Sequence, residues 1–257
     1  MSARTVAVTI TIALAVTAAA CSDGSTQLAT IPPTSAPSAS LPPVTIADPT
    51  TTTEVATSTS AAVATTVLPS NVVGLSEGGP WKLVDSAPGI TSPGLVYELM
   101  PKLWAFLPTE ESTDDGNLFV PTPADIPIIE AYLQASLVYF RAVTQRPIDL
   151  ADPGWAQFYG DRGESYFRVL SPKRADGQAV DLDLGVVLRP RVLGEGRTET
   201  TAILFDCAFD GGVFRRADGS LAEGSTPGIV LSGTASPMTL GGGRWTVDYV
   251  TNQPEAC

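Results

Sequence analysis

The chain has 257 residues, a formal net charge of −12 and no histidine. An acidic protein is poorly suited to binding nucleic acid or anionic lipid head groups through charge. The absence of histidine removes the most common general base and the most common metal ligand. We therefore expect no nucleic-acid partner, no metal site and no cofactor.

Residues 1–20 have the pattern of a secretory signal peptide. Arg4 precedes an apolar run over residues 6–16, which is shorter than the roughly 20 residues needed to span a bilayer. The following Ala18-Ala19-Ala20-Cys21 resembles the lipobox of bacterial lipoproteins, in which the cysteine receives a diacylglycerol and becomes the mature N-terminus. The resemblance implies an extracytoplasmic protein anchored to the bacterial cell membrane by lipidated Cys21. The alternative is an ordinary signal-peptide cleavage site followed by an unmodified cysteine.

Residues 21–70 form a predicted tether. Ser, Thr, Ala and Pro dominate this segment, and residues 22–70 contain no aromatic residue, no lysine and no arginine. Because so little apolar surface is available to offset the entropy of ordering, we expect the tether to be disordered. As a coil it would span roughly 40 Å. One hypothesis is that the protein serves only as a spacer, with the tether as its functional part.

Residues 71–120 form a predicted N-terminal β extension. Two apolar segments, Gly94–Leu99 and Leu103–Leu107, are typical of a hairpin that precedes the main domain. In an alternative arrangement these strands join the main sheet. The segment Gly74–Gly78 matches the nucleophile elbow of hydrolases, but no histidine is present to activate Ser76.

A long core helix is predicted over residues 122–145. Thr122-Pro123-Ala124-Asp125 provides a capping hydroxyl, a first-turn proline and an acid at the capping-box position, with Asp125 as the alternative cap, and Pro147 ends the helix. Polar residues occupy one narrow stripe, so other structure should cover most of its circumference. Shorter helices are expected after Asp152-Pro153 and over residues 161–170.

Beyond these helices the hydrophobic period changes from 3.6 to 2, which predicts an antiparallel meander. The four predicted strands are Asp181–Leu193, Thr198–Phe209, Ile229–Leu240 and Arg244–Asn252. Pro190 and Pro237 indicate that the first and third are edge strands or carry a bulge.

Helices followed by an antiparallel sheet, with the closing segment Gly243–Asp248 (Gly-Arg-Trp-Thr-Val-Asp), resemble the nuclear transport factor 2-like, or cystatin-like, domains. The resemblance covers residues 121–257. It implies an α+β domain in which helices pack on a curved, cone-like antiparallel sheet. A generic α+β layer is the competing architecture.

Cys207 and Cys257 remain as an even pair if Cys21 is acylated. In an oxidising compartment such a pair is expected to form a disulfide, although two reduced, buried thiols are an alternative.

Asp206 is the most interesting carboxylate. In the resembled fold one face of its strand lines a pocket, where a desolvated Asp206 near Tyr132, Tyr139 or Tyr249 would resemble the Asp/Tyr sites of isomerases and cyclases. Alternation does not decide whether Asp206 points there or outward, or bonds across the sheet. Other candidates are expected to be structural, namely Asp181 and Asp183 as solvated residues, Asp114 and Asp115 as a surface turn, and Trp155, Tyr159, Tyr166 and Phe167 as packing.

The sequence therefore supports two functional hypotheses. The first is a non-enzymatic lipoprotein whose folded part binds an envelope protein or a small apolar ligand. The second is a histidine-free isomerase or cyclase that uses Asp206 as base and a tyrosine as hydrogen-bond donor.

Overall fold

The computed structural model describes residues 72–111, 119–160, 163–253 and 257. The predicted signal peptide, Cys21, the tether and the Asp114-Asp115 turn lie outside the described residues. Within them the structure contains helices and a mostly antiparallel sheet, which confirms the α+β class. The helices are α1 (Ile126–Val143), α2 (Gly154–Phe158) and α3 (Gly163–Ala175). The strands are β1 (Lys82–Val84), β2 (Gly94–Met100), β3 (Leu103–Pro108), β4 (Ala179–Asp181), β5 (Val186–Leu188), β6 (Pro190–Leu193), β7 (Thr201–Asp210), β8 (Val213–Arg215), β9 (Val230–Gly241), β10 (Arg244–Val247) and β11 (Thr251–Asn252).

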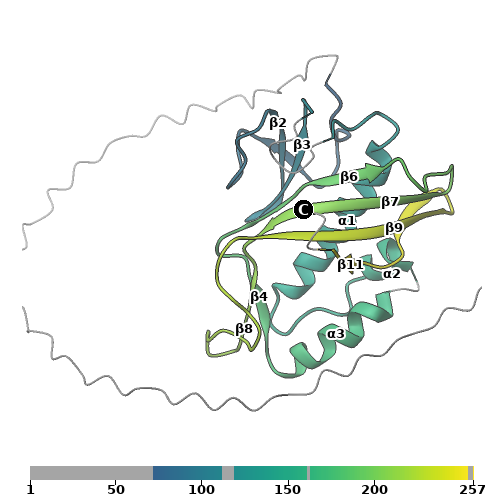
Figure 1. Ribbon diagram of the computed structural model, residues 1–257. Helices are drawn as coiled ribbons and strands as arrows, with labels where there is room; N and C mark the ends of the chain where they lie inside the picture. The colour runs from purple at the N-terminus through teal and green to yellow at the C-terminus, as the bar shows by residue number, and fades with distance from the viewer. Residues whose placement is uncertain (1–71, 112–118, 161–162, 254–256) are drawn as a thin grey trace, which may run out of the picture. The chain divides into compact units, whose positions relative to one another are not determined.

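The main sheet has the strand order β1-β2-β3-β5-β7-β9-β10, with β6 also paired to β7 and β11 to β9. Figure 1 shows β6, β7 and β9 side by side in this sheet. The predicted N-terminal hairpin is present as β2 and β3. It is not a separate layer, because β3 pairs in parallel with β5 from Leu103↔Val186 to Ala105↔Leu188. The first strands thus join the main sheet, as in the alternative arrangement.

The predicted meander is confirmed by the antiparallel pairs β6–β7, β7–β9 and β9–β10. The first predicted strand, Asp181–Leu193, is instead divided among three elements. β4 leaves the main sheet and pairs with β8 in a second, two-stranded sheet. β5 and β6 both pair with β7 and are separated at Arg189, directly before Pro190. A proline cannot donate to the ladder, which fits an interruption at this point.

The edge-strand alternative for Pro237 is wrong, whereas the bulge alternative is supported, because the register of β9 shifts by one residue between Met238↔Val247 and Ala235↔Thr251. β9 pairs with β7 on one side and with β10 and β11 on the other. On that second side the ladder passes from β10 at Met238 to β11 at Ala235. Pro237 lies in the gap, where no N–H is required, and its carbonyl accepts a hydrogen bond from Asp248 N–H (2.9 Å).

The core lies between α1 and one face of the sheet. Most of α1 is buried, as its apolar circumference predicts, and it contacts β6, β7 and β10. Asp125 stands at the N-cap, where its carboxylate accepts hydrogen bonds from both Thr122 N–H (2.8 Å) and Thr122 Oγ1 (2.7 Å). α2 follows Asp152-Pro153 as predicted, and α3 continues to Ala175, beyond the predicted end.

Candidate functional site

The alternation of β7 separates two kinds of environment. Leu204, Asp206 and Ala208 face α1, whereas Phe205 and Cys207 point to the opposite face and pack together with Ala235. Both faces are buried at these positions, because α1 covers one face and Leu193 and Cys257 pack against the other. Even-numbered residues in this part of β7 therefore face α1, and odd-numbered residues face the opposite side; we call this the parity of a residue along the strand.

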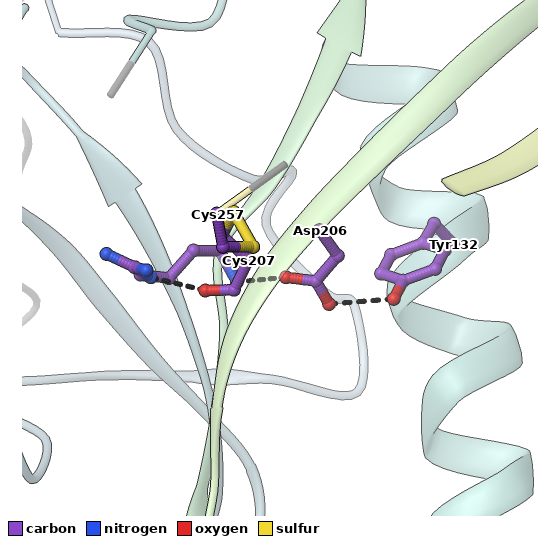
Figure 2. Close-up of a disulfide and its surroundings, with 5 residues drawn as sticks. Tyr132, Asp206, Cys207 and Cys257 are labelled. Atoms are coloured by element: carbon purple, nitrogen blue, oxygen red, sulfur yellow. Dashed lines mark hydrogen bonds between the residues drawn. A yellow bond between two sulfur atoms is a disulfide. The ribbon is translucent and has the colours of Figure 1, made fainter. Parts of the chain in front are cut away.

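Asp206 is fully enclosed, with only 1% of its surface exposed. The Tyr132 hydroxyl, from α1, donates a hydrogen bond to Asp206 Oδ2 (2.7 Å), and the Arg189 N–H donates to Oδ1 (2.6 Å). Arg189 lies between the end of β5 and the start of β6. Its N–H bonds to the Asp206 carboxylate instead of to a backbone carbonyl of a neighbouring strand. Figure 2 shows Asp206 and Tyr132 on one side of β7 and the Cys207–Cys257 disulfide on the other.

Burial governs the protonation of this pair. It raises the pKa of the Asp206 carboxyl to about 6, against the hydrogen bonds from Tyr132 and Arg189 N–H, which act to lower it. Burial also raises the pKa of Tyr132 well above its usual 10, and the negative charge of Asp206 adds to that effect. At pH 7 the pair is therefore mostly a carboxylate that accepts a hydrogen bond from a neutral phenol.

A cavity of about 310 Å³ opens beside this pair, between α1 and the sheet. Its volume lies at the lower end of the range for small-molecule pockets, about 300–1,000 Å³. Some lining residues, such as Asp206, are buried, and others, such as Asn252, are exposed, so the cavity reaches the surface. Its described lining consists of Tyr132, Ser136, Tyr139, Phe140, Tyr159, Tyr166, Val186, Leu188, Asp206, Ala208, Asp210, Ser232, Thr234, Val247, Val250 and Asn252.

A second carboxylate, Asp210, lines the same cavity from the same face of β7. Burial raises its pKa, while the hydrogen bond that it accepts from Gly212 N–H (2.8 Å) acts to lower it. The negative charge of Asp210 also acts on Tyr139, which lines the cavity from α1. Burial raises the pKa of Tyr139 to about 12, and the field of Asp210 contributes to this shift.

The structure brings together three of the four residues predicted for the Asp/Tyr site. Asp206, Tyr132 and Tyr139 line the cavity, and Asp206 points inward rather than to solvent. Tyr249 does not line the cavity and is 44% exposed, because β10 has already ended and its neighbour Val250 faces inward instead.

Four aromatic residues expected to serve only in packing divide into two pairs. Tyr159 and Tyr166 line the cavity, with ring centroids 4.8 Å apart. Trp155 and Phe167 lie behind them, 5.4 Å apart in an edge-to-face contact. The contributions of the first pair and of Asp210 to the cavity were not predicted from the sequence. Asp210 has the same strand parity as Asp206, and this spacing is the signal that points to it.

The predicted disulfide is present between Cys207 and Cys257, whose Cα atoms are 5.7 Å apart. It ties the last residue of the chain to the outer face of β7. Gly233 stands opposite Cys207 in the ladder, and a Cβ atom there would lie 2.9 Å from Cys257 Sγ.

The remaining candidates have structural partners. Asp181 pairs with Arg215 Nε (2.7 Å), and Asp183 pairs with Lys102 Nζ (3.2 Å). The Ser76 N–H donates to Glu130 Oε1 (2.5 Å), and no histidine exists in the chain to activate its hydroxyl. Within the described residues, no group of three or more potential ligands is placed to hold a metal ion.

None of the described helices is both long and apolar enough to cross a membrane. No protein-family model, curated protein or solved structure matches this chain. Inferences about its function therefore depend on the sequence signals and the cavity.

Proposed function

We propose that this protein is an extracytoplasmic lipoprotein, anchored to the bacterial membrane through Cys21, whose folded part binds a small ligand in the cavity between α1 and the main sheet. The observation that carries the proposal is the cavity itself, about 310 Å³ in volume, in which a few polar groups, among them Asp206 and Tyr132, stand between aromatic and aliphatic side chains. Sites of this composition commonly hold small molecules, with a few polar groups setting the orientation.

Two features support the extracytoplasmic location. Residues 1–21 have the order of charge, apolar run, small residues and cysteine found in lipoprotein signals. A disulfide between Cys207 and Cys257 suits an oxidising compartment. The cone-like, nuclear transport factor 2-like architecture belongs to the same proposal, supported by the position of the cavity between a long helix and a mostly antiparallel sheet.

Ligand binding is testable with the neutral fluorescent probe N-phenyl-1-naphthylamine, added to the full chain carrying Cys21→Ser so that no detergent is needed. We expect saturable binding at one site. Ala208→Phe should abolish it because the added ring fills the cavity, whereas Ala217→Phe, at an exposed turn, should leave it unchanged. If the probe does not bind the folded chain, or if Ala208→Phe binds it equally well, the cavity is not a ligand site.

Membrane anchoring is testable by the same substitution in cells. The unmodified chain should sediment with membranes and enter the detergent phase, whereas Cys21→Ser should be released in soluble form. Ser40→Ala provides the control, because it alters the predicted tether and leaves Cys21 and the disulfide in place. Retention of Cys21→Ser in the detergent phase would contradict the proposed anchor.

A second candidate function is acid–base catalysis of the isomerase or cyclase type. Asp206 favours it, because a buried carboxyl with a pKa of about 6 in a cavity is suited to exchange protons near neutral pH. The expected result is conversion of an envelope metabolite by the purified chain, followed by mass spectrometry, with the conversion lost in Asp206→Asn. Equal conversion by Asp206→Asn would exclude this role for the carboxylate.

A further inference from the structure

The cavity walls carry negative charge that no described lining residue neutralises. Asp206 and Asp210 are the charged groups among the described lining residues, and no lysine or arginine accompanies them. The four lining tyrosines are neutral near pH 7, since burial raises the pKa of each above its usual value; they are Tyr132, Tyr139, Tyr159 and Tyr166. The described wall thus carries two carboxyl groups and no basic side chain.

The positive charge of Arg189 lowers the pKa of the Asp206 carboxyl, but its guanidinium lies on the face of β7 opposite the cavity. Arg189 contacts Asp206 through its backbone N–H, but its Nε donates to the carbonyl of Cys207 (2.5 Å). Its guanidinium lies over the ring of Phe209, 4.2 Å from the centroid. Phe209 has the parity of Cys207 along β7, so this guanidinium belongs to the face opposite the cavity.

Aromatic rings make up much of the remaining wall. Tyr166 lies near both Tyr159 and Tyr139, with centroids 4.8 and 5.8 Å away, and Tyr139 meets Phe140 edge to face at 5.1 Å. The face of an aromatic ring carries negative electrostatic potential and attracts cations within about 6 Å of its centroid. Carboxylates and ring faces therefore favour the same sign of ligand charge.

The geometry points to an organic cation, an amine or a quaternary ammonium compound, as the ligand of this cavity, an inference that rests on the proposed function. Asp206 and Asp210 are four residues apart in a strand and thus about 13 Å apart along it, so one cationic group lies near one of them. A neutral ligand such as the reporter can pack against the rings but gains nothing from the two carboxylates, and an anion would be repelled. A cation gains from the carboxylates and from the rings.

The test uses choline and its uncharged carbon analogue 3,3-dimethyl-1-butanol, which have nearly the same shape and differ in charge. Both are titrated calorimetrically into the full chain carrying Cys21→Ser, beside N-phenyl-1-naphthylamine as the neutral reporter of the cavity. We expect choline to bind at least tenfold more tightly than the alcohol. Choline should also displace the reporter.

Single-residue variants test whether Asp210 and the aromatic rings cause the preference for choline over the alcohol. Asp210→Asn should reduce the preference for choline at least threefold and keep reporter binding, because asparagine can still accept the hydrogen bond from Gly212 N–H. Asp183→Asn is the matched control, since it removes the same charge from an exposed side chain paired with Lys102. Tyr166→Leu should weaken choline more than the alcohol, because it removes a ring face and keeps bulk.

The outcomes separate the two proposals. If the reporter binds but choline and the alcohol bind equally, or the alcohol binds more tightly, the cation inference is wrong and the proposed binding function stands. If neither the reporter nor choline binds a chain that shows a single cooperative melting transition, both proposals fail. An equal loss of choline preference in Asp210→Asn and Asp183→Asn would also overturn the inference, since the effect would then be one of net charge.

Discussion

The two faces of β7 differ sharply at adjacent residues. On the outer face Cys207 is covalently joined to Cys257 and packs with apolar neighbours. On the inner face Asp206 is held by two hydrogen bonds beside a cavity. The outer face is closed by packing, whereas the inner face keeps both an ionisable group and open volume.

We infer that the outer face of β7 mainly stabilises the fold, whereas the inner face serves the proposed binding function. A buried carboxylate with a raised pKa weakens the folded state at neutral pH, and a cavity forgoes packing contacts. A disulfide that constrains the same strand from the other side offsets part of that cost. Substitutions on the outer face should therefore change stability alone, and those on the inner face should change both stability and binding.

The largest expected effect comes from the outer face. Cys207→Ala with Cys257→Ala opens a loop with a sequence separation of 50 residues. By the chain-entropy relation this lowers the free energy of unfolding by about 4 kcal/mol. Urea denaturation at pH 7 measures the change, and reduction of the unmodified chain with dithiothreitol should give a similar value.

Binding provides the discriminating readout for this variant. Under conditions where the double alanine chain remains folded, its affinity for N-phenyl-1-naphthylamine should stay within twofold of that of the unmodified chain. A folded variant that no longer binds the probe would show that the two faces of β7 are not independent.

The next effect is a pH dependence from the inner face. The pKa of Asp206 is about 6 in the folded chain and 3.8 for an ordinary aspartate, so the folded state binds this proton more tightly. The contribution of Asp206 to stability is fully present below pH 3.8 and is lost as the pH rises through 6, a change of about 3 kcal/mol. Asp206→Asn removes this dependence.

Parallel urea denaturation at several pH values between 4 and 7 tests this prediction. The free energy of unfolding of Asp206→Asn minus that of the unmodified chain should increase as the pH rises, because only the unmodified chain loses stability. Asp183→Asn, whose side chain is 67% exposed, should instead follow the unmodified chain. A constant difference between Asp206→Asn and the unmodified chain across this range would contradict the raised pKa.

Local signals made much of the fold predictable. The apolar circumference of residues 122–145 anticipated α1, and period-2 patterning anticipated β7 and β9. The predicted Thr122 cap was wrong, because α1 begins at Ile126 and the alternative, Asp125, is its N-cap. Pairing between distant segments has no local signal, which is why the parallel contact of β3 with β5 was not singled out. The departure of β4 into a second sheet was missed for the same reason, since it depends on its distant partner β8.

The candidate site was only partly predictable. Ile203, Leu204 and Phe205 are all apolar because both faces of β7 are covered, so alternation of polarity did not reveal the direction of Asp206. Tyr249 was expected inside by extending the strand pattern past Val247, where β10 ends. Tyr159 and Tyr166 reach the cavity from separate helical segments, and only their arrangement in three dimensions brings them together.

A smaller effect on the outer face concerns Gly233, opposite Cys207. A Cβ atom there would clash with the carbonyl oxygen of Gln253 and lie 2.9 Å from Cys257 Sγ. Gly233→Ala should therefore cost about 2 kcal/mol through overpacking and increase the fraction of free thiols. Gly241→Ala is the matched control, since no atom lies within 4 Å of its added Cβ. Equal stability of the two variants would show that the outer face is not tightly packed.

The smallest of these effects isolates one hydrogen bond on the inner face. Tyr132→Phe removes the donor to Asp206 Oδ2 and keeps the ring, which should cost about 1.5 kcal/mol at pH 7. The same change should raise the pKa of Asp206 further, because that bond stabilises the carboxylate. Carbon NMR titration of the carboxyl group measures this shift, and Tyr166→Phe provides a control that leaves the bond in place. If the pKa does not rise while the disulfide stays formed, burial alone sets the pKa of Asp206. The hydrogen bond from the Tyr132 hydroxyl then does not stabilise the carboxylate.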